Sequence, residues 1–135
     1  MKDNLQLATE YLYGTILGRY VTMNHINSFL ETLHSGFNIS TVGFSVENNP
    51  IKAIQFGEGK TKILVWSQMH GNESTTTKGL IDYLNYLNLN ENEFKNITKN
   101  YTLYIIPILN PDGAILYTRE NANKVDLNRD AFNCS

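Results

Sequence analysis

The sequence has one cysteine in 135 residues, which excludes an internal disulfide and a zinc site built from several cysteines. No apolar run approaches the roughly 20 residues that a membrane-spanning helix needs, and the first 20 residues lack the apolar core of a signal peptide. Lysine and arginine (11) do not outnumber aspartate and glutamate (13), which argues against nucleic acid or an anionic membrane as the main partner. We therefore expect a cytoplasmic protein with neither of these partners.

The composition is that of a globular chain with a real core, because 41% of the residues are hydrophobic and 11% are aromatic. At this length the chain forms one domain or part of one. Residues 5–14 and 25–36 have helical spacing, and a glycine, Gly14 or Gly36, stands at the end of each. We expect residues 1–37 to form a helical N-terminal prefix.

The middle of the chain predicts an α/β fold. Residues 37–69 read as three strands with breaks at ENNP and GEGK. KILVW (62–66) and YTLYIIPIL (101–109) lack alternation, which predicts two neighbouring parallel strands, central in the sheet and buried on both faces. A helix is expected from about Ser74 to Leu87, and the polar residues 88–100 read as a loop. Strand, helix, strand in this order implies a right-handed crossover.

The stretch SQMHGNES, residues 67–74, lies where a strand gives way to a helix. Ligands bind beyond the carboxyl ends of strands in open α/β sheets, and His70 stands at such an end. Glu73 falls on the same turn, so one imidazole and one carboxylate can hold two corners of a zinc tetrahedron. The alternative is that Glu73 favours the helix start through the dipole and that His70 only packs.

Two later motifs carry polar groups of other kinds. NPDG, residues 110–113, predicts a turn. In VDLNRD, residues 125–130, Arg129 can bind a carboxylate with two parallel hydrogen bonds, and Asn128 adds an amide donor. Arg119 is a second basic candidate. The alternatives are an Arg129 paired with Asp126 or Asp130 and an Arg119 in a solvated loop.

The order HGNE, NPDG and DLNR, with the first two each following a strand, resembles the zinc carboxypeptidase family (the M14 peptidases) over about residues 42–132. The resemblance implies a mixed sheet with flanking helices and one zinc ion held by His70 and Glu73. It also implies that Asn128 and Arg129 bind the free C-terminal carboxylate of a peptide substrate. Arg119 then corresponds to the arginine that polarises the scissile carbonyl, and the reaction is hydrolysis of C-terminal peptide bonds.

The chain departs from the family pattern because no histidine follows the NR pair to serve as third zinc ligand, and neither the general-base glutamate nor a later tyrosine is present. His25, His34 and Glu120 match no motif. We expect residues 38–135 to be the N-terminal portion of a catalytic domain, inactive alone and able to self-associate through a cut sheet edge. Two alternatives stay open: an N-acyl-amino acid hydrolase of the desuccinylase or aspartoacylase type, and a non-catalytic fragment or carboxylate-binding module.

Overall fold

The computed structural model describes residues 4–130. Its helices and strands follow in the order α1 (Asn4–Tyr11), α2 (Met23–Leu30), β1 (Asn38–Phe44), β2 (Pro50–Phe56), β3 (Thr61–Trp66), α3 (Thr75–Leu89), α4 (Glu91–Asn100), β4 (Tyr101–Ile106) and α5 (Pro111–Leu116). The four strands form one mixed sheet in the order β1-β2-β4-β3. Residues 131–135, which end the expected catalytic portion, lie outside the described residues.

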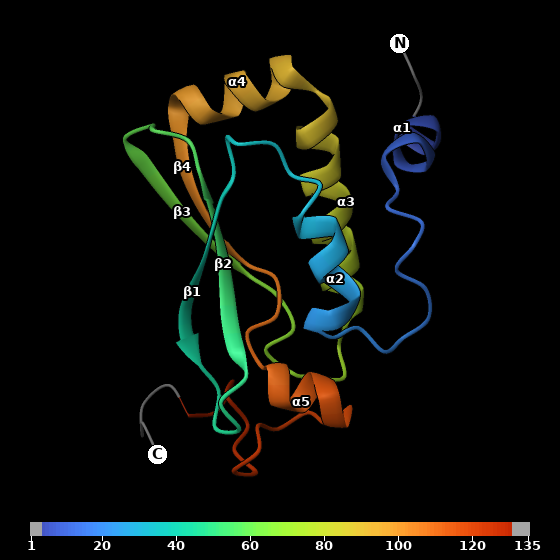
Figure 1. Cartoon of the computed structure of the whole chain (residues 1–135), viewed down its shortest axis with the longest axis vertical. Coiled ribbons are helices and arrows are strands. Elements are labelled where there is room, and N and C mark those ends of the chain that lie inside the picture. Colours follow the sequence, from blue (N-terminus) through green and yellow to red (C-terminus); the bar gives the residue numbers. More distant parts are fainter. Residues whose placement is uncertain (1–3, 131–135) are drawn as a thin grey trace.

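The core lies between one face of this sheet and the helices α2 and α3, which cover that face (Figure 1). Each helix and strand contributes apolar side chains to this core, spaced three or four residues apart in a helix and two apart in a strand. The fully or almost fully buried members include Ile26, Phe29, Ile54, Phe56, Ile81, Leu84, Leu87, Ile105 and Ile108. Helix α2 of the N-terminal segment therefore shares its core with the sheet. No described helix is both long and apolar enough to cross a bilayer.

The mixed sheet with flanking helices confirms the predicted fold class. β3 and β4 are parallel neighbours, as predicted, and pair from Thr61 with Tyr101 to Trp66 with Ile106. The prediction that KILVW is central and buried on both faces is wrong. β3 lies at the edge of the sheet, and Leu64 and Trp66 are 57% and 46% exposed. Unbroken apolar residues indicate two covered faces only where a second layer is present, and no described helix covers this face.

Two further predictions about local structure are corrected. The expected loop at 88–100 contains the helix α4, which lies across one end of the sheet (Figure 1). The apolar pattern of this helix is weak because only two apolar side chains, Phe94 and Ile97, pack against the core, and both are partly buried. NPDG is more than a turn, because Asn110 caps α5 by accepting a hydrogen bond from the Gly113 N–H.

Candidate active site

The first candidate site lies where β3 ends and α3 begins, at the carboxyl end of the two parallel strands. His70 is 8% exposed, and its carbonyl accepts a hydrogen bond from the Glu73 N–H at 3.0 Å, which closes a turn over residues 70–73. The two side chains converge, because His70 Nδ1 lies 3.1 Å from Glu73 Oε2. We call residues 70–73 the ligand turn. The predicted convergence of His70 and Glu73 is therefore seen in the structure.

Gly71 lets the ligand turn lie directly against α5. A Cβ atom at Gly71 would be 1.8 Å from the carbonyl carbon of Gly113 and 2.2 Å from the nitrogen of Ala114. Only glycine fits at this distance, since the neighbours are backbone atoms that cannot move aside. The HGNE and NPDG motifs are thus in contact through their glycines.

Arg119 and Asp126 complete a closed arrangement of four side chains, which we call the four-residue ring. Glu73 Oε1 lies 3.4 Å from Arg119 Nη1, and Arg119 Nε donates to Asp126 Oδ2 at 2.9 Å. Asp126 Oδ1 is 3.1 Å from His70 Nε2. The ring alternates nitrogen-bearing and acidic side chains, so each carboxylate has two partners within it. It brings together three of the five predicted site residues.

Asp126 fixes the orientation of the imidazole. Desolvation raises the pKa of Asp126, but hydrogen bonds from Arg119, from the Asn128 N–H and from His70 outweigh it and hold this pKa below its usual range. Because an ionised carboxylate can only accept, Nε2 is the nitrogen that donates to Asp126. Nδ1 is then the nitrogen that faces Glu73.

This geometry fits two corners of a zinc site. Zinc binds nitrogen and oxygen ligands at about 2.0–2.2 Å, so two ligand atoms of a tetrahedron are about 3.3 Å apart. His70 Nδ1 and Glu73 Oε2 are separated by 3.1 Å. A carboxylate on the far nitrogen is also the usual support of a zinc-binding histidine. Within residues 4–130 no three histidine, cysteine or acidic side chains are grouped to hold a metal by themselves.

Asn128 and Arg129 are held beside the ring by their backbone. The Asn128 N–H donates to Asp126 Oδ1 at 3.0 Å, and the Arg129 N–H donates to the Asp126 carbonyl at 2.8 Å. Both side chains are exposed, and Arg129 Nη1 donates to the carbonyl of Asn128 at 3.1 Å. Among the described residues neither side chain is hydrogen-bonded to His70, Glu73 or Arg119.

Sequence reasoning missed two carboxylates around this site. The local sequence suggests Asp126 only as a partner for Arg129, whereas it joins His70 to Arg119. The rule that a metal-binding histidine has a carboxylate behind it was a signal for such a residue. The NPDG pattern predicts a turn and indicates no separate role for Asp112.

Asp112 fastens the β1–β2 turn to α5. The carboxylate, 2% exposed, accepts from Ser45 Oγ at 2.5 Å, from Asn49 Nδ2 at 2.8 Å and from the Glu47 N–H at 3.2 Å. Burial raises the pKa of Asp112, but these hydrogen bonds outweigh it and keep the pKa below its ordinary value. These hydrogen bonds therefore support the helix against which the ligand turn packs.

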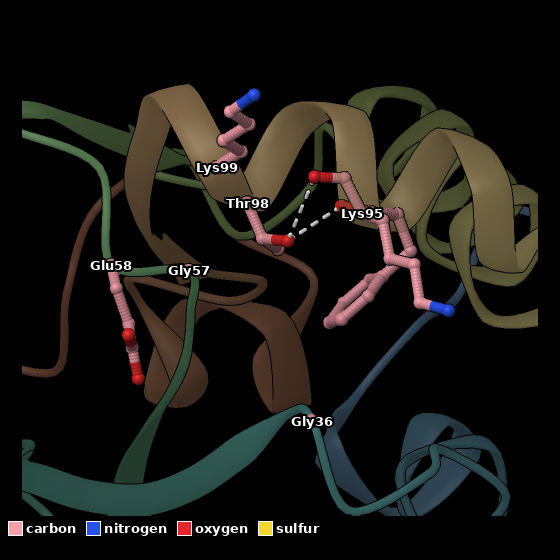
Figure 2. Close-up of a pocket in the computed structure, with 7 residues that line it drawn as sticks. Gly36, Gly57, Glu58, Lys95, Thr98 and Lys99 are labelled. Atoms are coloured by element: carbon pink, nitrogen blue, oxygen red, sulfur yellow. Dashed lines mark hydrogen bonds between the residues drawn. The ribbon is translucent and has the colours of Figure 1, made fainter.

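A hollow of about 530 Å³ lies at the other end of the sheet beside α4. Figure 2 shows that Glu58, Lys95 and Lys99 line it with their charged ends pointing in different directions. Lys95 is paired with Glu91 on its own helix. A binding site needs polar groups that converge, so the four-residue ring is the stronger candidate.

Comparisons with known proteins bear on this arrangement. The model of the family described as zinc carboxypeptidase matches residues 23–134. The chain belongs to the zinc carboxypeptidase family. Carboxypeptidase SOL1 of Arabidopsis thaliana is 32% identical over 99 residues, which cover 67% of this chain and 20% of that protein. Carboxypeptidase E of Caenorhabditis elegans is 32% identical over 112 residues, or 66% of this chain and 24% of the relative.

The fold is shared with solved members of the family. A metallo-carboxypeptidase from Pseudomonas aeruginosa, in complex with (2-guanidinoethylmercapto)succinic acid, superposes with a TM-score of 0.66 at 24% identity. The match covers 82% of this chain and 31% of that chain. The chain spans between a fifth and a third of the length of the curated relatives it matches. Zinc carboxypeptidases are metal-dependent hydrolases that act on peptides.

Proposed function

We propose that this chain supplies the first part of a metallocarboxypeptidase site, with His70 and Glu73 as two zinc ligands. The observation that carries the proposal is the four-residue ring, where His70 Nδ1 and Glu73 Oε2 lie 3.1 Å apart and Asp126 supports the opposite nitrogen. Family membership adds that the relatives are zinc carboxypeptidases. When bound, zinc polarises the scissile carbonyl and lowers the pKa of a coordinated water to about 7.

The residues of the chain have separate tasks in this proposal. Asp126 holds the His70 ring so that Nδ1 points at the metal position. Arg119 Nη1 lies 3.4 Å from Glu73, which places the guanidinium beside the proposed ligands. Because the side chain is 43% exposed, its remaining N–H groups can donate to a substrate carbonyl oxygen that gains negative charge.

Asn128 and Arg129 are proposed to hold the C-terminal carboxylate of a peptide. Their side chains are exposed while their backbone is tied to Asp126, which gives a carboxylate clamp on a fixed base. A guanidinium with free N–H groups binds a carboxylate through two parallel hydrogen bonds. Such a clamp orients the substrate and restricts cleavage to the last peptide bond.

We infer that residues 1–135 alone hydrolyse peptides too slowly to measure. The ring provides two ligands, whereas catalytic zinc sites use three protein ligands and a water. Assay of the purified chain with zinc on blocked dipeptides is expected to release no C-terminal amino acid. Zinc-dependent release that disappears in Glu73→Gln would overturn this inference. The N-acyl-amino acid hydrolase alternative gains no support, because the relatives reported above are all carboxypeptidases.

Calorimetric titration with Zn²⁺ tests the metal site itself. The wild-type chain is expected to bind weakly through its two ligands, and His70→Ala is expected to abolish binding. His25→Gln is the matched control, because it removes an imidazole while glutamine at this position keeps the capping box with Thr22. Equal zinc affinity of His70→Ala and wild type would refute the site.

A further inference from the structure

Gln68 has a backbone conformation that is unusual for its residue type. Its φ is 48°, in the left-handed region that favours glycine, although the residue has a long side chain. It lies two residues before His70, and it is 3% exposed. Strain of this kind persists only where the surrounding structure enforces it, and it is concentrated at functional sites.

Both polar atoms of the Gln68 carboxamide have hydrogen-bond partners. Nε2 donates to the carbonyls of Val21 and Gly71, both at 2.8 Å, and Oε1 accepts from Thr77 Oγ1 at 2.8 Å. The opposite orientation of the amide would set its oxygen against two carbonyl oxygens, so these partners determine which atom is nitrogen. The side chain thus joins the N-terminal segment, the ligand turn and α3.

Gln68 is itself anchored on both sides. Thr77 is fully buried in the first turn of α3, and its hydroxyl also lies 2.7 Å from Ser67 Oγ. The backbone carbonyl of Gln68 accepts from the Asn110 N–H at 3.2 Å, which ties it to the start of the NPDG motif. A buried polar network whose members are all satisfied is rigid.

The bond to the Gly71 carbonyl reaches the ligand turn between its two proposed ligands. Gly71 is pressed against Gly113 on one side and held by Gln68 Nε2 on the other. We propose that Gln68, locked by Thr77, is a positioning residue that fixes the separation of His70 Nδ1 and Glu73 Oε2. This inference rests on the proposed zinc site and assigns the strained residue a role within it.

The test is metal binding by the full chain, measured with Co²⁺ through its visible absorption and with Zn²⁺ by calorimetry. Gln68→Met keeps the length of the side chain and removes its hydrogen bonds. Loss of a supporting residue typically lowers metal affinity by about 10- to 100-fold, and we expect a loss in this range together with a changed Co²⁺ spectrum. Thr77→Val is expected to lower affinity in the same direction, and Thr77→Ser, which keeps the hydroxyl, is expected to restore it.

Thr102→Val is the matched control. Thr102 is also buried, and its hydroxyl donates to the carbonyl of Gly59 at 2.7 Å, far from the ligand turn. The Thr102→Val variant loses a comparable hydrogen bond and is expected to leave the metal affinity and the Co²⁺ spectrum unchanged. If Thr102→Val weakens binding as much as Gln68→Met, the effect is general destabilisation and the inference is wrong.

The outcomes separate this inference from the proposed function. Unchanged binding in His70→Ala refutes the zinc site. Binding that is lost in His70→Ala and retained in Gln68→Met refutes the role of Gln68 alone. If Gln68→Met does not fold, amide hydrogen exchange on the wild-type chain is the test. If Gln68 holds the ligand turn rigidly, the Glu73 amide is expected to exchange as slowly as the amides within α3. Exchange of that amide at the rate of an exposed loop would overturn the proposal.

Discussion

The two ends of the sheet are held by different kinds of contact, apolar at one end and polar at the other. At the α4 end the aromatic rings of Phe37, Phe56 and Phe94 pack with centroids 4.9–5.9 Å apart. At the α5 end hydrogen bonds and ion pairs join buried or half-buried side chains such as Gln68, His70 and Asp126. Both ends need a glycine against backbone, Gly59 at the first and Gly71 at the second.

This difference separates stability from function. Apolar packing contributes reliably to stability, whereas burying charged groups often contributes little net free energy. We therefore expect the ion-paired side chains of the polar end to contribute more to binding than to stability. The strained φ of Gln68 lies at the polar end, in agreement with this division.

The largest effect on stability is expected at the aromatic end. Phe56 is 2% exposed and packs on Phe37 and Phe94. Phe56→Ala is expected to lower the free energy of unfolding by about 3–5 kcal/mol, through lost burial and the cavity left behind. Urea unfolding followed by circular dichroism measures this. A loss below that of the site variants would break the comparison.

A smaller and pH-dependent loss is expected for Asp112→Asn. Hydrogen bonds to a charged group are worth about 1.5–3 kcal/mol each. Asparagine keeps one of the two acceptor oxygens, so we expect a loss of about one such bond at pH 7. Because the folded-state pKa of Asp112 is lowered, its contribution is complete above the unfolded value of about 3.9 and is lost as the pH falls through the folded value.

Urea unfolding of wild type and Asp112→Asn between pH 3 and pH 8 tests this sign. The difference between the two is expected to be constant at neutral pH and to narrow in acid, below about pH 4. Asp82→Asn is the control, because Asp82 accepts from the Tyr13 N–H and lies on a different part of the core. A difference that grows as the pH falls would contradict the role given to the ionised Asp112.

Arg119→Met is expected to leave stability almost unchanged. The side chain is 43% exposed, and surface ion pairs are typically worth about 0–1 kcal/mol. The same variant is expected to change the environment of Glu73 and Asp126, seen as shifts of their carboxylate resonances. Strong destabilisation would mean that the ring supports the fold as much as the aromatic end does.

The smallest effect on folding is expected on the open sheet face, for Leu64→Lys. We propose that two copies of this 135-residue chain associate at β3, because this strand lies at the sheet edge among the described residues and exposes Leu64 and Trp66. Leu64→Lys is expected to shift sedimentation toward the monomer with little change in unfolding. Equal association of both proteins would refute this interface.

The sequence predicted those helices and strands whose apolar residues mark the side that is buried. It did not predict features that depend on how distant elements pack together. α3 followed from its helical apolar spacing, and the parallel pairing of β3 with β4 followed from their apolar runs without alternation on either side of that helix. The edge position of β3 did not, since strand order is decided by long-range packing that a local pattern does not contain. α4 was missed because a helix that lies across a sheet end needs few apolar residues.

The sequence predicted the two proposed zinc ligands of the site. It did not predict which residues hold them in position. His70 and Glu73 are three apart on one turn, so their convergence follows from local geometry. Asp126 is 56 residues from His70, and its contact depends on the path of the chain after α5. The left-handed conformation of Gln68 has no sequence signal, because glutamine rarely adopts it.

The most direct test of the account is the nitrogen spectrum of the histidine side chains during titration with Zn²⁺. The two-bond ¹H–¹⁵N correlations of His70 are expected to change at Nδ1, while Nε2 keeps its proton toward Asp126. His25 and His34 are expected to be unaffected. Zinc that perturbs His25 or His34 first, or leaves His70 Nδ1 unchanged, would contradict a metal site at the ligand turn.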